Sequence, residues 1–209
     1  MNGIEEQLIK IKLLAGGENG MLDSVVSIHL ATFRGFFLTF MGRGFLKQMY
    51  RSYCEHNESD LLVAVDSSGT VVGFLAYSED MSGLYKYMIK RHIVVFAWYS
   101  LGAFLRRPKI FIRLIRAFLK PGEAKRNENY VELASIGVDP NVKSKGIGTA
   151  MIHALKERVD FSKHQYISLE TDALNNKTAN CFYVKNGFVL HRVFETREGR
   201  IMNEYRFQE

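Results

Sequence analysis

The chain has little cysteine and lacks several features that would assign it to a protein class directly. Its two cysteines, Cys54 and Cys181, are too few for a disulfide framework in 209 residues. The opening residues MNGIEEQLIK carry two glutamates where a secretory signal peptide would be basic. No internal repeat or low-complexity run occurs. These absences predict a cytoplasmic protein, and 47% apolar residues are enough to bury the core of one domain over residues 1–209.

Acidic residues are missing from one long segment. Residues 81–122 contain nine of the 28 lysines and arginines but none of the 22 aspartates and glutamates, which leaves 19 basic against 22 acidic residues elsewhere. The formal net charge of +6 therefore arises in this segment. An anionic partner, if charge selects one, is expected there.

Long apolar runs are also missing. The uncharged run Ile93 to Leu105 has thirteen residues, whereas a membrane-spanning helix needs roughly 20. Beyond Pro108 the spacing predicts an amphipathic helix. Its basic side consists of Lys109, Arg113, Arg116 and Lys120, and its apolar side of Phe111, Leu114, Ile115 and Phe118.

This predicted basic helix has three interpretations. Its apolar side packs on the protein core, or lies in a membrane interface beside anionic headgroups. A third use is compatible with either: the basic face lies over the acceptor pocket and holds the phosphates of an anionic acceptor. Packing is the more common outcome. The short uncharged run favours a packed or acceptor-side role over contact of residues 85–120 with a membrane surface. Nucleic acid is disfavoured because the segment has no recognised binding fold and its aromatic residues fall on the apolar side.

Hydrophobic periodicity predicts a mixed order of strands and helices. A strand is expected near residues 8–14, and two helices follow around residues 22–30 and 45–50. The stretch LLVAVDSSGTVVGFLAY predicts a central antiparallel hairpin. After the basic segment come a strand at 130–138, a helix at 146–159, a strand at 166–170, a helix at 176–185 and a hairpin over 188–207. The predicted fold class is α/β (α+β): a mixed, mostly antiparallel sheet flanked by helices, with a helical insertion at about residues 81–122.

The stretch VDPNVKSKGIGTAM places two glycines where a strand gives way to a helix. It is not a Walker loop, because no Gly-Lys-Ser/Thr follows the required spacer. The free N–H groups and positive dipole end of a helix suit a pyrophosphate, and Lys143 and Lys145 add positive charge. A plain strand-to-helix turn with solvated lysines is the alternative.

A second motif, NNKTANCFYVKNGF, follows the next predicted strand. Together with K-x-x-G-x-G it resembles the two signatures of the GNAT superfamily of acetyl-coenzyme A-dependent N-acetyltransferases. The residues of the second signature that fall in register are Asn176, Ala179, Tyr183, Gly187 and Phe188. Lys143 stands where the family has Gln or Arg, yet lysine still donates to phosphate. The resemblance is strong over residues 130–207, weaker over 23–77 and absent over 81–122.

The resemblance implies how acetyl-coenzyme A would bind. Backbone N–H groups of the turn would hold its pyrophosphate, while the strand Val131 to Val138 splays from its neighbour and pairs with the pantetheine arm. Donors near Ile136 and Val138 would stabilise the oxyanion that forms at the thioester. The predicted binding residues are Ile136, Gly137, Val138, Lys143, Ser144, Lys145, Gly146, Ile147, Gly148, Thr149 and Asn176.

The resemblance also implies a reaction, namely direct transfer of the acetyl group to a primary amine. Tyr183 would protonate the departing thiolate, and Glu132, fourteen residues before Gly146, would act as the base, with Glu170 and Asp172 as reserves. By composition alone, Tyr183 is also compatible with a core role, and its register with Asn176, Gly187 and Phe188 favours the acid role. Glu132 is as compatible with a solvated or paired role as with that of the base. No metal site is expected, because the six histidines show no paired ligand spacing.

The acceptor is the least specified part. The stretch FFLTFMGRGF with the basic insertion resembles GNAT proteins from bacterial polysaccharide gene clusters, which implies an amino-sugar acceptor. The residues that would line its pocket, or else belong to the core, are Phe33, Phe36, Phe37 and Arg43. The competing hypothesis is a non-catalytic GNAT-like module that binds a partner or a membrane surface through the basic insertion.

Overall fold

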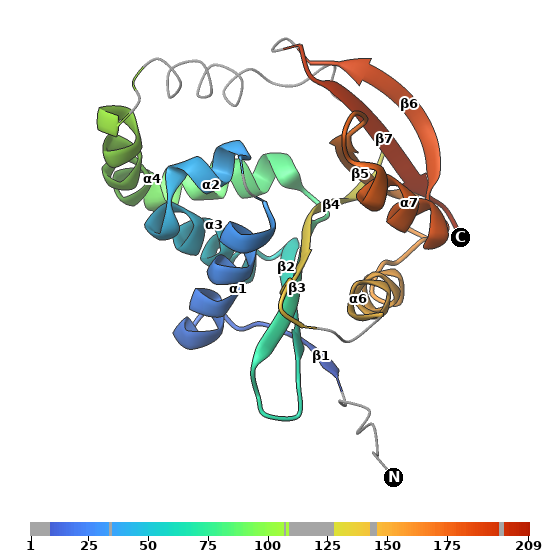
Figure 1. The fold of residues 1–209 in the computed structure, drawn as a ribbon, viewed down its shortest axis with the longest axis horizontal. Helices are drawn as coiled ribbons and strands as arrows, with labels where there is room; N and C mark the ends of the chain where they lie inside the picture. Colours follow the sequence, from blue (N-terminus) through green and yellow to red (C-terminus); the bar gives the residue numbers. More distant parts are fainter. Residues whose placement is uncertain (1–8, 34, 107, 109–127, 143–145, 197–198) are drawn as a thin grey trace.

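A single mixed sheet organises the protein (Figure 1). The computed structural model describes residues 9–33, 35–106, 108, 128–142, 146–196 and 199–209. The sheet order within these ranges is β1-β2-β3-β4-β5-β7-β6, and of these neighbours only β4 and β5 run parallel. The predicted mostly antiparallel sheet is thus confirmed. Its strands are β1 (Lys10–Leu13), β2 (Ser59–Val65), β3 (Val71–Ser78), β4 (Tyr130–Val138), β5 (Tyr166–Asp172), β6 (Val189–Glu195) and β7 (Ile201–Phe207).

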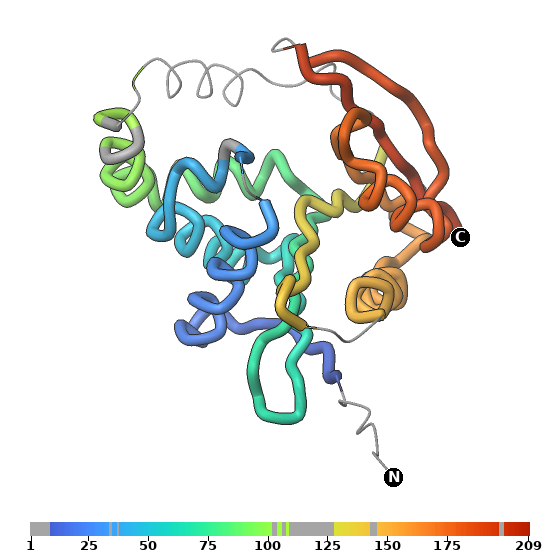
Figure 2. Tube along the Cα trace, in the orientation of Figure 1, coloured from blue at the N-terminus to red at the C-terminus, as the bar shows by residue number. Residues whose placement is uncertain are grey.

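Helices cover both faces of the sheet, as the tube in Figure 2 makes visible. One side carries α1 (Asn19–Thr32), α2 (Phe37–Met41), α3 (Arg43–Glu55) and α4 (Met81–Arg106). The other side carries α6 (Ile147–Lys156) and α7 (Lys177–Lys185). The short helix α2 lies where the sequence predicts only a turn.

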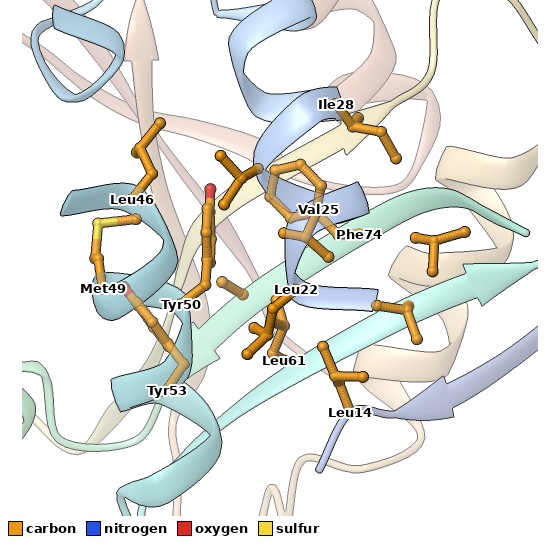
Figure 3. Packing of buried hydrophobic residues seen from close by; sticks show 14 of the residues in the cluster. Leu14, Leu22, Val25, Ile28, Leu46, Met49, Tyr50, Tyr53, Leu61 and Phe74 are labelled. Atoms are coloured by element: carbon orange, nitrogen blue, oxygen red, sulfur yellow. The ribbon is translucent and has the colours of Figure 1, made fainter. Parts of the chain in front are cut away.

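Each face has its own hydrophobic cluster, because β2 and β3 in the middle of the sheet are buried on both sides. On the side of α1 and α3, the Tyr50 ring lies 5.1 Å from that of Phe74, and Leu22 and Leu46 are fully buried beside them (Figure 3). On the other side, buried residues of α6 such as Leu155 pack on β2, β3 and β5. The two clusters hold the sheet rigidly between two helical layers.

The sheet opens between β4 and β5. Their parallel pairing covers only Tyr130–Glu132 on β4 and Tyr166–Ser168 on β5. On its other edge β4 stays paired with β3 as far as Val138, with a register shift that leaves Ala134 as a bulge. The second half of β4 therefore has a neighbour on one edge only among the described strands.

The basic segment begins with the long helix α4. This helix is kinked at His92, whose imidazole Nε2 lies 3.0 Å from the carboxylate Oε2 of Glu55 on α3. The predicted basic helix beyond Pro108 lies outside the described residues. None of the helices in the described ranges is long and apolar enough to cross a membrane.

Candidate active site

The open edge of β4 presents backbone groups. Asp139 N–H donates to the Val72 carbonyl on β3 at 2.9 Å. Successive residues of an antiparallel strand point their N–H groups to opposite edges, so the Gly137 N–H also faces β3. The N–H groups of Ile136 and Val138 therefore face the other edge of β4, with which β5 no longer pairs at this point. The two predicted backbone donors therefore lie side by side on the open edge.

The end of α1 covers one face of this half-strand. A Cβ atom on Gly137 would lie 2.8 Å from Cε1 of Phe74 and 3.5 Å from Cε2 of Phe33, so only glycine fits between β4 and these rings. The Thr32 hydroxyl lies 3.4 Å from the Val138 carbonyl oxygen. Phe33, at the end of α1, thus forms a wall next to the open edge.

The glycine turn begins α6. Gly146 precedes the helix with a φ of +97°, a conformation that side chains strain to adopt. Ala150 donates to the Gly146 carbonyl at 2.8 Å, so the N–H groups of Ile147, Gly148 and Thr149 belong to the first turn and precede this helical bond. Lys143, Ser144 and Lys145 lie outside the described residues.

Packing joins this turn to the second motif. A Cβ atom on Gly148 would lie 3.1 Å from two ring carbons of Phe182 on α7. Glycine at this position therefore lets α7 approach the start of α6. The residue after Phe182 is Tyr183, so the glycine turn at the start of α6 and the predicted acid lie on neighbouring, directly packed elements.

Tyr183 is held among aromatic rings. Its ring centroid lies 5.4 Å from that of Phe182 and 6.0 Å from those of Phe188 and Tyr205. Burial raises the pKa of Tyr183 to about 12. No hydrogen bond joins its hydroxyl to another of the described residues. The Tyr183 hydroxyl is therefore protonated at neutral pH. The Tyr183 ring also packs against the hydrophobic cluster on the α6 side of the sheet, which agrees with the core role that composition left open.

Glu132 lies on the opposite face of the sheet. Val131 and Leu133 on either side of it are buried in the cluster with α6, so alternation directs Glu132 toward α3 and α4. Burial raises the pKa values of Tyr53 on α3 and Tyr85 on α4, and the charge of Glu132 raises both further. The charge of Glu132 therefore acts on both hydroxyls, from the point where β4 and β5 separate.

The two reserve carboxylates differ in their surroundings. Glu170 contributes to the raised pKa of Tyr85, after burial and Glu132, and so shares this face. Asp172 forms an ion pair with Arg200, whose Nη2 lies 2.8 Å from both carboxylate oxygens. Asp172 would therefore have to give up its ion pair with Arg200 in order to act as the base.

Asn176 directly precedes α7, and its side chain makes no capping bond to the helix but donates from Nδ2 to the Thr171 hydroxyl at 2.8 Å. Sequence reasoning missed the role of Asn180, one turn later. Its Oδ1 accepts from Asn203 Nδ2 at 2.7 Å and from the Tyr205 hydroxyl at 2.9 Å, and its Nδ2 donates to two carbonyls at the end of β5 and the start of α7. Asn180 therefore fixes α7, and Tyr183 with it, to β7.

Sequence reasoning also missed a buried polar chain beneath β4. His29 Nδ1 lies 2.6 Å from the Tyr50 hydroxyl, which lies 3.4 Å from the Ser135 hydroxyl on β4. Burial lowers the pKa of His29 to about 4, so the imidazole is neutral at physiological pH. These contacts tie α1 and α3 to the strand segment just before Ile136.

The residues predicted to line an acceptor pocket separate into two places. Phe33 and Phe36 have ring centroids 5.7 Å apart, and the Arg200 guanidinium carbon lies 5.6 Å from the Phe36 ring. Arg43 instead donates to the Ser27 hydroxyl at 2.9 Å and borders an open hollow of about 610 Å³ between Met41–Gly44 and α4. The Phe37 side chain lies outside the described part of the structure.

This combination matches a known family. The profile of the acetyltransferase (GNAT) family matches residues 23–188, well over half of the chain. The chain belongs to this family. Acetyl-coenzyme A is the acyl donor of the family, and the chain is accordingly an acetyl-coenzyme A-dependent acyltransferase. No curated protein sequence matches this GNAT chain.

Solved GNAT structures share the fold at low sequence identity. An acetyltransferase of the GNAT family from Bacillus cereus has 12% identity and a TM-score of 0.59, over 97% of this chain and 98% of that chain. The ribosomal-protein alanine N-acetyltransferase from Escherichia coli has 14% identity and a TM-score of 0.57, over 96% and 94%. The NatC complex bound to Gag peptide and CoA gives 14% identity and 0.57, over 96% and 98%.

Proposed function

We propose that the chain is an N-acetyltransferase that transfers the acetyl group of acetyl-coenzyme A directly to a primary amine of a small-molecule acceptor, with amino sugars as one candidate class. The observation that carries the proposal is the open edge of β4 beside the glycine-led start of α6. Ile136 and Val138 direct N–H groups to that edge, and α7 with Tyr183 packs on Gly148.

Acetyl-coenzyme A fits this arrangement along its length. The first turn of α6 supplies N–H groups and the positive end of a helix dipole to the pyrophosphate. The β4 edge supplies the hydrogen bonds that an extended pantetheine arm requires. Its last donors then lie next to the thioester oxygen, where they stabilise the negative charge of the tetrahedral intermediate.

The chemistry needs three proton movements. A base takes the proton of the ammonium group so that the amine nitrogen attacks the carbonyl carbon. The C–S bond breaks, and the thiolate takes a proton from the Tyr183 hydroxyl, which the raised pKa of about 12 keeps protonated. The second proton of the attacking nitrogen is released as the intermediate collapses and restores the tyrosine.

Glu132 is the proposed base. It belongs to the opposite face of the sheet from Tyr183, so deprotonation of the amine and protonation of the thiolate would proceed on different sides of the reacting carbonyl. Glu170 is the reserve, because the bidentate pair with Arg200 occupies Asp172. Phe33 and Phe36, beside the open edge, are the proposed acceptor walls.

A panel of amines tests the reaction. Acetyl-coenzyme A is incubated with the protein and with amino sugars, amino acids, short peptides or alkylamines, and thiol release is recorded together with the mass of the acetylated product. The proposal predicts thiol release that depends on both enzyme and amine for at least one class. Binding of acetyl-coenzyme A without amine-dependent thiol release across the panel would instead favour the non-catalytic module.

A further inference from the structure

Helix α4 exposes a continuous apolar surface, here called the α4 stripe. It comprises Val94, Trp98, Leu101 and Leu105, all beyond the kink at His92, whose exposed fractions range from 48% to 78%. Their intervals of four, three and four residues put them within about 60° of one another around the helix axis. The stripe holds four of the sixteen exposed large apolar residues of the described chain on a single element.

The opposite side of the same helix is packed. Leu84 and Met88 are buried, the Phe96 ring lies 4.9 Å from that of Phe45, and a Cβ atom on Gly44 of α3 would lie 2.2 Å from Cε1 of Tyr99. Beyond the kink at His92, α4 is therefore apolar on the side that meets α3 and also on the exposed side, where Trp98, Leu101 and Leu105 border the open hollow beside Met41–Gly44. A helix that is apolar on all sides is typically buried on all sides, so we expect the stripe to contact a second surface besides α3.

Charge indicates which surface this is. Lys86, Lys90 and Arg91 are exposed on the part of α4 that precedes the kink and leads into the stripe. The segment 81–122 has nine basic and no acidic residues, so a second copy of the chain docking symmetrically through this segment would set basic residues against basic residues. The partner surface must therefore offer an apolar region to the stripe and negative charge to the basic residues.

We propose that the α4 stripe docks on the surface of an anionic lipid bilayer, with α4 lying in the plane of the interface. Tryptophan is enriched where a bilayer meets water, and exposed lysine and arginine on the neighbouring part of α4 would add attraction to anionic headgroups. The helix runs outward from the sheet past α2 and α3 (Figure 1), and the side chains of the stripe are exposed along it. This docking does not depend on which amine is acetylated.

The single tryptophan of the chain makes the proposal directly measurable. Trp98 is 73% exposed and lies in the middle of the stripe. With vesicles of equal parts phosphatidylglycerol and phosphatidylcholine, its emission is expected to shift to the blue and to become protected from acrylamide. Vesicles of phosphatidylcholine alone are expected to produce a much smaller shift, and high salt to weaken the anionic response.

Two variants that keep the probe separate the apolar and basic contributions. Val94→Gln with Leu105→Gln is expected to weaken vesicle binding at least about 10-fold, because both exposed side chains would enter the acyl boundary. Lys86→Gln with Lys90→Gln is expected to weaken it by roughly 5-fold per residue. Val189→Gln with Val193→Gln, which changes two exposed valines on β6, is the matched control and is expected to bind like the parent.

Four results would overturn the proposal. They are no Trp98 response to anionic vesicles, an unchanged response in the Val94/Leu105 variant, shielding of Trp98 from acrylamide before vesicles are added, and a blue shift that grows with protein concentration alone. The third would mean that another part of the chain covers the stripe. The fourth would mean that a second copy does. Unchanged circular dichroism and melting temperatures of all variants ensure that a lost response reports docking rather than unfolding.

Discussion

Two side chains on opposite faces of the sheet divide the proposed proton transfers between them. Tyr183 is surrounded by aromatic rings that raise its pKa, whereas the charge of Glu132 acts on the hydroxyl groups of Tyr53 and Tyr85. Each assignment therefore predicts a different response to substitution, and a neighbouring residue of the same chemical type provides the control.

Tyr183→Phe removes the proposed acid and keeps the ring. We expect kcat to fall by about 10- to 10⁴-fold with little change in acetyl-coenzyme A affinity or melting temperature, because no described residue bonds to the hydroxyl. The parent enzyme should keep the protonated Tyr183 up to about pH 12, so no alkaline loss of rate should come from this group below that pH. Tyr205→Phe is the control, since its hydroxyl bonds to Asn180 and its loss should cost stability rather than rate. Parallel losses of stability and activity in Tyr183→Phe would make Tyr183 a core residue only.

Glu132→Gln tests the base. We expect kcat/KM for the amine to fall by about 10²- to 10⁴-fold at neutral pH and to recover partly at alkaline pH, where the amine loses its proton to solvent. Asp172→Asn, which weakens the pair with Arg200, should leave kcat far less affected. A normal rate in Glu132→Gln together with a large loss in Glu170→Gln would transfer the base role to Glu170.

Among the elements, the start of α6 carries the clearest expectation. Gly146→Glu and Gly146→Gln force the same strained φ of +97°, but only the glutamate sets a negative charge beside the proposed pyrophosphate site. Like charges at contact distance cost about 1 to 4 kcal/mol, or roughly 5- to 10³-fold in affinity. Titration calorimetry should therefore show weaker acetyl-coenzyme A binding in the glutamate variant than in the glutamine variant. Equal affinities would remove the turn from the binding site.

Sequence patterns predicted the elements whose signals are local. The two hairpins, the strand-turn-helix at Gly146 and the helix bearing Tyr183 were all readable, because turn residues and apolar spacing lie within a few positions of one another. Asn180 was not, since its partners Asn203 and Tyr205 are 23 and 25 residues away and no spacing connects them. The same holds for the contact between His29 and Tyr50.

Helix α4 illustrates a different limit of sequence analysis. The uncharged run Ile93 to Leu105 was readable as helical, but apolar residues on all sides leave open which side the protein covers. That choice was decided by tertiary contacts of α3, where Gly44 admits Tyr99 and Phe45 meets Phe96. The exposed stripe on the outer side could not be predicted from periodicity alone.

For the molecule as a whole, we propose that both helical layers belong to one cooperative domain, because β2 and β3 contribute to both hydrophobic clusters. Leu46→Ala on α3 and Leu155→Ala on α6 each empty a fully buried site and should each cost about 2 to 5 kcal/mol. Calorimetry should record one transition that either variant lowers. Two transitions, each shifted by only one of the variants, would mean that the layers unfold as separate units.

The most direct test of the account is amide exchange along β4, followed by nuclear magnetic resonance with and without saturating acetyl-coenzyme A. The central claim is that the edge of β4 with which β5 does not pair holds the pantetheine arm and the thioester. We predict that the amides of Ile136 and Val138 exchange more slowly once the cofactor is bound. Gly137 and Asp139, which face β3, should be protected in both states. Unchanged exchange at Ile136 and Val138 with acetyl-coenzyme A demonstrably bound would contradict the claim.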